Sequence, residues 1–397
     1  MSEFKTYTLE QLCIVGSSKR VHLSDYVQHG VPFYRSKEVI EISSGKNISE
    51  QLFISSEKYS EIKSKFPVPQ ENDVLITAVG TIGEILVVKD PNFYFKDGNL
   101  IWLRNINFDI IDIDYLYYFF KSDLFQKTIK YNNIGAVQKA LTIDFLKTVK
   151  ITLPSLDNQR KLVSVLKSID QKIHTNNQIN QELEAMAKTL YDYWFVQFDF
   201  PDQNGKPYKS SGGKMVYHPE LKREIPEGWG VARLDQLQIA TGKRDANFGT
   251  ENGKYDFWTT ANSPIKADEF SFEGKAILIA GNGNFYVNFT DGKFEAYQRT
   301  YVIQSEDEKM LIFMYMACLQ SAEKLRKASN GSIIKYITIG DVNNISSPYD
   351  HNVVDEFVKI YRPLIDQISK NKKQNQELTQ LRDWLLPMLM NGQVKVE

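Results

Sequence analysis

Two segments of the chain carry apolar residues at alternating spacings of four and three, which is the heptad pattern of helices that pack side by side. The first stripe runs from Leu162 to Trp194, and the second repeats its register 195 residues later, from Phe357 to Leu389. Arg382 is the single clear violation. Asp157 stands just ahead of the first stripe, where an N-cap is expected. The pattern predicts two long helices of one design.

Four asparagines inside these stripes, Asn176, Asn180, Asn371 and Asn375, predict how the helices pair. In an antiparallel pair whose facing residue numbers sum to 551, Asn176 faces Asn375 and Asn180 faces Asn371. A buried asparagine facing an aliphatic residue would cost roughly 1 to 3 kcal/mol, whereas two facing amides satisfy each other and fix the register. A parallel pair also matches the asparagines, but the domain between the helices favours an antiparallel spacer of roughly 50 Å.

Ahead of each helix lies a segment in which short β-branched and aromatic runs alternate with Gly, Asn and Pro turns, which predicts short strands. The two segments match: Leu9 to Arg20 recurs as Leu234 to Arg244. The chain is therefore a diverged tandem duplication. We expect an α+β fold with two similar mixed α/β domains joined by an antiparallel coiled coil, in a pseudo-twofold internal repeat. The expected segments are 1–152 and 230–350 for the mixed domains, 153–198 and 351–397 for the helices, and 199–229 for the linker.

Composition narrows the class of protein. With 397 residues, 42% hydrophobic, 24% charged and a net charge of -1, the chain is expected to form ordinary globular domains. The longest apolar run, Met310 to Leu319, is too short to span a membrane, and no signal peptide is recognised. Two isolated cysteines exclude a disulfide framework. We expect a cytoplasmic protein without a membrane partner, on which any nucleic-acid surface must be local because the total charge is balanced.

Motifs for catalysis are missing from the sequence. The phosphate-loop pattern and the GxSxG nucleophile elbow are absent, and the five histidines are scattered without metal-binding spacing. A glycine pair around Asn282 follows a predicted strand, but its context is not that of a dinucleotide-binding unit. We therefore expect no catalytic residue, no metal and no cofactor in this chain.

Candidate binding residues occur at matching places in the two halves. Basic pairs and polar glycine loops suit contacts to phosphates and base edges, since such loops let the backbone approach a partner closely. The alternative for each basic residue is a solvated surface side chain, and for each loop a simple strand turn. The candidate DNA-binding residues are Lys19, Arg20, Arg35, Thr81, Gln138, Lys139, Lys243, Arg244, Asn282, Asn284, Lys335 and Tyr336.

The ordered set of motifs resembles the DNA-specificity subunit of type I restriction-modification systems. The resemblance covers essentially the whole chain and rests on short motifs that recur in order. These are Leu153-Pro154 with Asn158-Gln159-Arg160, Thr81-Ile82-Gly83, Ile225-Pro226-Glu227-Gly228-Trp229, and the two loops that lead from glycine to Lys139 and Lys335. The second helix departs from the pattern, because Val353-Val354-Asp355 replaces the Asn-Gln-Arg motif.

The resemblance implies a non-catalytic recognition subunit whose two target-recognition domains each bind one half of a bipartite, asymmetric sequence in double-stranded DNA. It further implies that the helices set the gap between the half-sites and dock two methyltransferase subunits, which bind S-adenosylmethionine. Separate restriction subunits, with motor and nuclease activity, would complete the complex. Two alternatives remain open: a duplicated coiled-coil scaffold that binds two protein partners and no DNA, and an enzyme whose catalytic residues follow no recognised motif.

Overall fold

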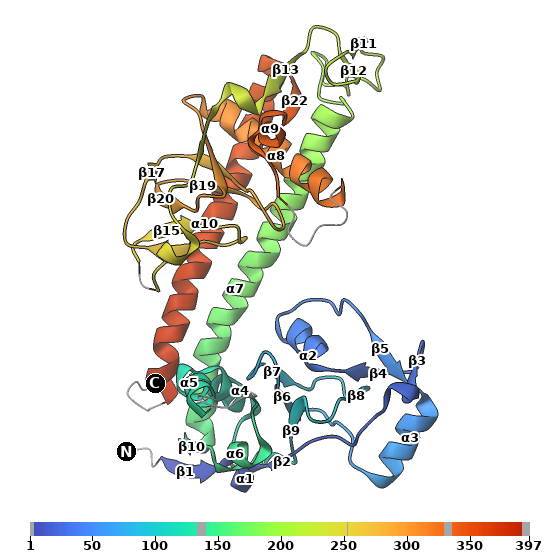
Figure 1. Cartoon of the computed structure of the whole chain (residues 1–397), viewed down its shortest axis with the longest axis vertical. Helices are drawn as coiled ribbons and strands as arrows, with labels where there is room; N and C mark the ends of the chain where they lie inside the picture. The colour runs from blue at the N-terminus through green and yellow to red at the C-terminus, as the bar shows by residue number, and fades with distance from the viewer. Residues whose placement is uncertain (1–3, 133–139, 252, 329–335, 391–397) are drawn as a thin grey trace. The chain divides into compact units, whose positions relative to one another are not determined.

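Both predicted helices are present and are the longest elements of the structure (Figure 1). Helix α7 spans Leu156–Tyr191 and continues as a π-helical turn, Asp192–Val196, while α10 spans His351–Met390. The computed structural model describes residues 4–132, 140–251, 253–328 and 336–390. The predicted N-cap is wrong, because α7 begins at Leu156. Asp157 therefore lies in the first turn, where its carboxylate still interacts favourably with the helix dipole.

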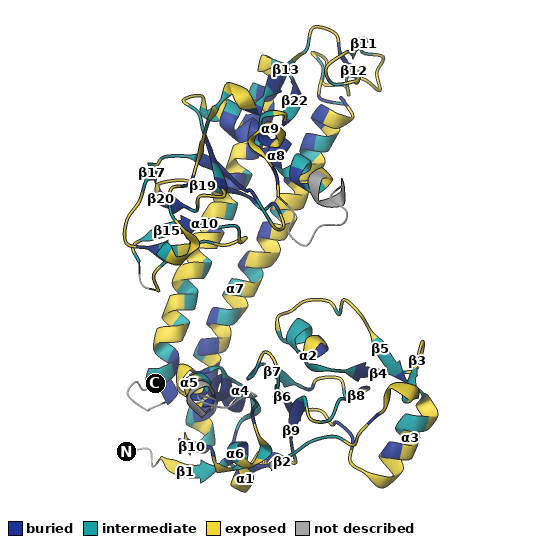
Figure 2. Ribbon diagram, in the orientation of Figure 1, coloured by how far each residue is buried: buried dark blue, intermediate teal, exposed yellow. Residues whose placement is uncertain are grey.

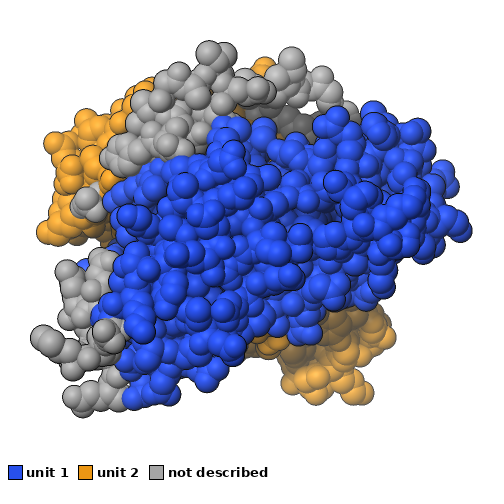
Figure 3. Space-filling view, turned by 90° about the horizontal axis from the view of Figure 1, so that it is seen from below, with its two compact units in different colours: residues 1–174, 374–397 blue, residues 175–373 orange. Residues whose placement is uncertain are grey.

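The chain divides into two units, residues 1–174 with 374–397 and residues 175–373, which we call unit 1 and unit 2 (Figure 3). Each unit combines one mixed domain with a stretch of α7 and a stretch of α10. Each mixed domain is therefore accompanied, within its own unit, by parts of both long helices.

Unit 1 begins with short strands and helices that precede α7. Its strands are β1 Lys5–Thr8, β2 Ile14–Gly16, β3 Tyr26–Val27, β4 Val31–Tyr34, β5 Leu52–Ile54, β6 Val74–Thr77, β7 Ile85–Val87, β8 Tyr94–Phe95, β9 Leu100–Arg104 and β10 Lys150–Leu153. Its helices before α7 are α1 Leu9–Leu12, α2 Ser36–Ser43, α3 Ser56–Lys65, α4 Ile113–Lys121, α5 Asp123–Asn132 and α6 Ile143–Thr148.

After its stretch of α7, unit 2 continues with a hairpin of β11 and β12, followed by strands without an intervening α-helix as far as α8. Its strands are β11 Met215–His218, β12 Arg223–Pro226, β13 Gly230–Arg233, β14 Gln238–Thr241, β15 Tyr255–Trp258, β16 Ile265–Ala267, β17 Phe272–Glu273, β18 Ala276–Ala280, β19 Val287–Thr290, β20 Lys293–Ala296, β21 Thr300–Gln304 and β22 Ser346–Tyr349. Its helices before α10 are α8 Glu308–Ala328 and α9 Ile339–Asn343.

Each unit contains two four-stranded sheets, and only one of them has the same strand order in both units. The other has the order β3-β5-β4-β8 in unit 1 and β16-β15-β20-β17 in unit 2. The matching sheet has the strand order β2-β9-β6-β7 in unit 1 and β14-β21-β18-β19 in unit 2, and all its pairings are antiparallel. The other sheet contains one parallel pair in each unit, β4 with β8 and β15 with β20. A short antiparallel pair, β1 with β10 and β13 with β22, leads into each long helix. The duplication seen in the sequence is therefore preserved in the antiparallel sheet and in the strand pair before each long helix, while the strand order of the other sheet has diverged.

The helix stretches pair in antiparallel fashion within each unit. In unit 2, the Asn371 Nδ2 donates a hydrogen bond of 2.9 Å to the Asn180 Oδ1, and the rings of Trp194 and Phe357 lie 6.0 Å apart. Both pairs have residue numbers that sum to 551. In unit 1, Leu162 and Leu389 belong to the same buried cluster. Buried and exposed positions alternate along both helices (Figure 2). The predicted fold class and the antiparallel pairing are confirmed within each unit.

The heptad violation has a structural partner. The Arg382 guanidinium donates a hydrogen bond of 2.9 Å to Asp170, and the Tyr118 hydroxyl donates to the other oxygen of that carboxylate at 2.7 Å. At the equivalent positions, 195 residues away, unit 2 has Ala187 and Ile365, which lie in its apolar core. The arginine is therefore not a defect of the stripe but one half of an ion pair that joins α4, α7 and α10 in unit 1.

The second asymmetry involves Gln159, which is fully buried near the start of α7. Its side chain accepts a hydrogen bond from the Asp112 backbone N–H and donates to the carbonyls of Ile110 and Pro154. The equivalent Val354 of unit 2 is buried without any such polar atoms. The glutamine side chain thus fastens the loop before α4 onto α7 in unit 1 only.

Candidate nucleic-acid interface

The glycine loops and the residues that directly follow the predicted lysines meet in both units. In unit 1, Val79, in the loop after β6, forms a β-bridge with Ala140. In unit 2, Asn282, in the loop after β18, forms the equivalent bridge with Tyr336. Thr81 is exposed two residues after Val79, and Tyr336 is 72% exposed. Segments more than 50 residues apart in sequence are therefore brought together at one loop cluster in each unit.

Three of the predicted residues, Gln138, Lys139 and Lys335, lie outside the described residues. Asn284 is exposed, and its amide donates to the Tyr286 hydroxyl at 3.2 Å. The Asn282 Oδ1 is buried and has no hydrogen-bond partner among the described residues. The loop before Asn282 requires glycine, because a Cβ on Gly281 would lie 2.5 Å from the Arg299 carbonyl oxygen. Close backbone packing at Gly281 therefore fixes the start of the loop, directly before Asn282.

The basic pair of unit 1 divides into an arginine held by a carboxylate and a lysine that forms no ion pair with a described residue. The Arg20 guanidinium donates to Asp97 at 3.0 Å, although its side chain stays 73% exposed. The Lys19 backbone N–H donates to the hydroxyl of the buried Tyr94 at 2.8 Å, and the Lys19 ammonium lies 4.6 Å from the centre of the Phe66 ring. A lysine held on an aromatic face keeps its charge available for a phosphate.

Unit 2 repeats this division at the equivalent pair. The Arg244 guanidinium contacts Glu269 at 2.6 Å and the fully buried Glu295 at 3.4 Å, so two carboxylates offset its charge. The Lys243 ammonium makes no ion pair with a described residue and lies 5.7 Å from the centre of the Phe272 ring. In both halves the arginine is paired with a carboxylate of its own unit, and the lysine is the cation left for a partner.

Arg35 lies apart from the basic pairs, at the N-cap of α2. Its guanidinium contacts the fully buried Glu38 at 2.7 Å and Glu50 at 3.4 Å. The hydrogen bonds to Glu38 raise the pKa of Arg35 above its ordinary value. Since Glu38 would otherwise be a buried unpaired charge, this arginine has a structural task in addition to any contact with DNA.

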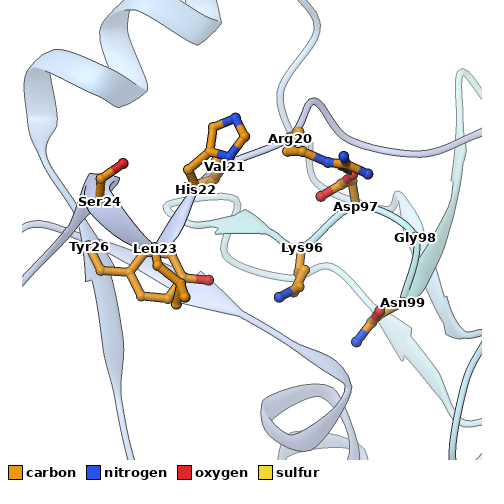
Figure 4. Close-up of a pocket in the computed structure, with 10 residues that line it drawn as sticks. All are labelled: Arg20, Val21, His22, Leu23, Ser24, Tyr26, Lys96, Asp97, Gly98 and Asn99. Carbon is orange, nitrogen blue, oxygen red and sulfur yellow. Dashed lines mark hydrogen bonds and ion pairs between the residues drawn. The ribbon is translucent and has the colours of Figure 1, made fainter.

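A cavity of about 660 Å³ opens beside the basic pair of unit 1 (Figure 4). Arg20 lies against Asp97 at its edge, and the Lys96 and Asn99 side chains extend from the same loop to one side of the cavity. Leu23, at the opposite wall, is 80% exposed. Sequence reasoning missed Lys96 and Asn99, because isolated polar residues in a loop carry no periodic or motif pattern.

Two properties of the described residues bear on metal binding and on nucleophilic chemistry. These residues contain no group of three or more His, Cys, Asp or Glu side chains that could hold a metal ion. Burial raises the pKa of the Cys13 thiol to about 12, so this cysteine is not a nucleophile at neutral pH. Within the same part of the chain, no helix is long and apolar enough to cross a membrane.

Comparison with known proteins identifies the class. The family model of the type I restriction modification DNA specificity domain matches residues 1–185 and 226–380. The chain therefore belongs to the type I restriction-modification DNA specificity family, as its motifs predict.

Two relatives and one solved structure illustrate the similarity. The chain is 28% identical over 418 residues to the MjaIX specificity subunit of Methanocaldococcus jannaschii, a match that covers 96% of this chain and 91% of that protein. It is 34% identical over 186 residues to the EcoDI specificity subunit of Escherichia coli, covering 44% of this chain and 40% of that protein. The crystal structure of the S subunit from M. genitalium matches with a TM-score of 0.56 at 16% identity, over 98% of this chain and 96% of that chain. That likeness shows a shared fold.

Proposed function

We propose that this chain is the subunit that selects the DNA sequence in a type I restriction-modification complex, and that each unit binds one half of a bipartite, asymmetric site. The observation that carries the proposal is the repeated loop cluster. Both units bring a glycine loop, the segment after a predicted lysine, and a Lys-Arg pair to equivalent places around the matching antiparallel sheet, and the loops carry different side chains in the two copies. Equivalent surfaces with different chemistry suit two unlike half-sites.

Sequencing of methylated DNA tests the proposal directly. The expected result is a bipartite methylation motif in cells that hold this chain together with its methyltransferase, and loss of that motif when only this chain is removed. A motif that persists without the chain would contradict the proposal. A protein scaffold predicts no motif that depends on this chain, and an unrecognised enzyme predicts turnover by the isolated chain.

The long helices are proposed to act as the ruler that sets the gap between half-sites. One heptad adds roughly 10 Å to a helix, or about three base pairs of DNA. Inserting seven residues into α7 between His174 and Thr175, and into α10 between Lys373 and Gln374, should lengthen the preferred gap and leave both half-sites unchanged. Replacing one heptad by another of equal length is the matched control. An unchanged gap in the insertion variant would refute the ruler.

The outer faces of the helices are proposed to dock two methyltransferase subunits, one for each repeat. Leu381 in unit 1 is 43% exposed and Met186 in unit 2 is 58% exposed, at positions that the duplication makes equivalent. Trp384, 58% exposed, extends the apolar surface on α10. We expect Leu381→Glu and Met186→Glu each to reduce the mass of the complex by one methyltransferase. Full occupancy in both variants would exclude these positions from the interface.

In this assignment the chain itself is not catalytic and holds no cofactor. The methyltransferase subunits bind S-adenosylmethionine, and the restriction subunits supply the motor and nuclease activities. Lys139→Ala and Lys335→Ala are expected to weaken recognition of one half-site each. Normal methylation by both variants would remove these lysines from the DNA surface.

A further inference from the structure

One position before a central strand is equivalent in the two units yet carries different side chains. Asn99 directly precedes β9, and Arg299 directly precedes β21. The Asn99 carbonyl accepts a hydrogen bond of 2.8 Å from the Ala78 N–H, and the Arg299 carbonyl accepts one of 2.7 Å from the Gly281 N–H. The strands that follow pair with β6 and β18 in the same register. The same backbone hydrogen bond therefore fixes this position in both units.

The side chains at this position form no polar contact with the part of the chain that the structure describes. The Asn99 amide and the Arg299 guanidinium make no hydrogen bond or ion pair with any described residue. Arg299 is exposed, and Asn99 lines the cavity of unit 1. The arginines of the basic pairs differ in this respect, because both Arg20 and Arg244 are held by carboxylates. A fixed backbone with an unpaired polar side chain is suited to a partner outside the protein.

The position also lies where the two sets of predicted DNA-binding residues approach each other. In unit 1, Asn99 follows Asp97, the partner of Arg20, and its carbonyl holds the start of the glycine loop. In unit 2, Gln298, the residue before Arg299, donates its backbone N–H to the Arg244 carbonyl at 2.9 Å. In each unit, the residue before this strand (Asn99 before β9, Arg299 before β21) thus lies between the basic pair and the loop cluster.

We propose that Asn99 and Arg299 are the equivalent base-contacting residues of the two units, Asn99 selecting adenine and Arg299 selecting guanine. Asparagine pairs in a bidentate manner with the N6 and N7 edge of adenine, and arginine with O6 and N7 of guanine in the major groove. One structural position with two chemistries gives each unit its own base preference, as an asymmetric site requires. The inference rests on the proposed function and adds the residues that carry its specificity.

The test exchanges the two side chains in the full chain, expressed with its methyltransferase, and measures the methylation motif. Asn99→Arg is expected to change an adenine to a guanine at one position of one half-site only. Arg299→Asn is expected to make the reverse change in the other half-site. Asn99→Ala and Arg299→Ala should reduce the preference at that position by about tenfold or more without a new one. Asn47→Ala and Lys206→Ala, which alter exposed polar residues elsewhere, are the matched controls.

The outcomes separate this inference from the proposed function. A wild-type complex without a motif that depends on this chain overturns both. A wild-type motif that all four variants retain overturns the base contacts alone. Uniform weakening of DNA binding with an unchanged motif and a shallower salt dependence also overturns them, because that is the behaviour of phosphate contacts.

Discussion

Replacing Asn180 with leucine should destabilise the helix pair of unit 2 by about 1 to 3 kcal/mol. Asn180 is 6% exposed and Asn371 is 4% exposed, so water cannot readily replace the hydrogen bond of 2.9 Å between them. In Asn180→Leu, the Asn371 amide loses its acceptor but keeps the bond that its Oδ1 accepts from Gln367. In Asn371→Leu, both Asn180 and Gln367 lose their partner. The second substitution should therefore cost at least as much as the first.

The double variant Asn180→Leu/Asn371→Leu completes a double-mutant cycle and tests whether the two amides satisfy each other. Two leucines remove both buried asparagine amides, and the Gln367 amide that loses its acceptor is exposed to water, so the double variant should be more stable than either single variant. Hydrogen exchange of the backbone amides in residues 175–191 and 351–373 measures the local free energy of opening without assuming a two-state unfolding of the whole chain. Additive losses in the double variant would refute the view that the amides satisfy each other.

Three further predictions follow from other contacts. Arg382→Ala should lower the stability of unit 1 in urea unfolding, because the Asp170 carboxylate loses its cation. Adding Asp170→Ile, which copies the equivalent residues of unit 2, should restore part of the loss, since the Tyr118 hydroxyl then has no acceptor; equal stability of Arg382→Ala and the wild type would contradict this. Lys19→Ala and Lys243→Ala should each reduce the salt dependence of DNA binding by the complex by about 0.9 in the log-log slope, and an unchanged slope would exclude a phosphate contact. Gln159→Leu should raise the exchange rate of the Asp112 amide in unit 1, because its acceptor is lost; unchanged protection would show that this hydrogen bond does not fasten the loop.

The helices and their pairing followed from the sequence because a heptad stripe is a local and periodic property. Each residue of a helix faces the same side as those three and four positions away, so the spacing alone defined the buried face. The duplication then supplied a second copy of the stripe, and the constant sum of facing numbers located the hydrogen bond between Asn180 and Asn371. The ion pair of Arg382 was not predictable in this way, since Asp170 itself occupies a position outside the stripe.

The candidate site depends on contacts between residues far apart in the chain. Lys19 and Arg20 were found because the repeat places a second pair at 243 and 244, but their unlike roles depend on Tyr94, Asp97 and Glu295, which no pattern connects to them. No sequence pattern marks Asn99 or Arg299, because a single polar residue before a strand resembles any other loop residue.

The sequence by itself determined the duplicated α+β class, the two long helices, their antiparallel register and the family, because these depend on periodicity and on motifs repeated along the chain. The tertiary structure alone decided which basic side chains are neutralised by carboxylates and which polar side chains remain free. The physical reason is that charge pairing and burial depend on distances in space. In this protein, those distances are set by strand register and backbone hydrogen bonds between segments widely separated in sequence.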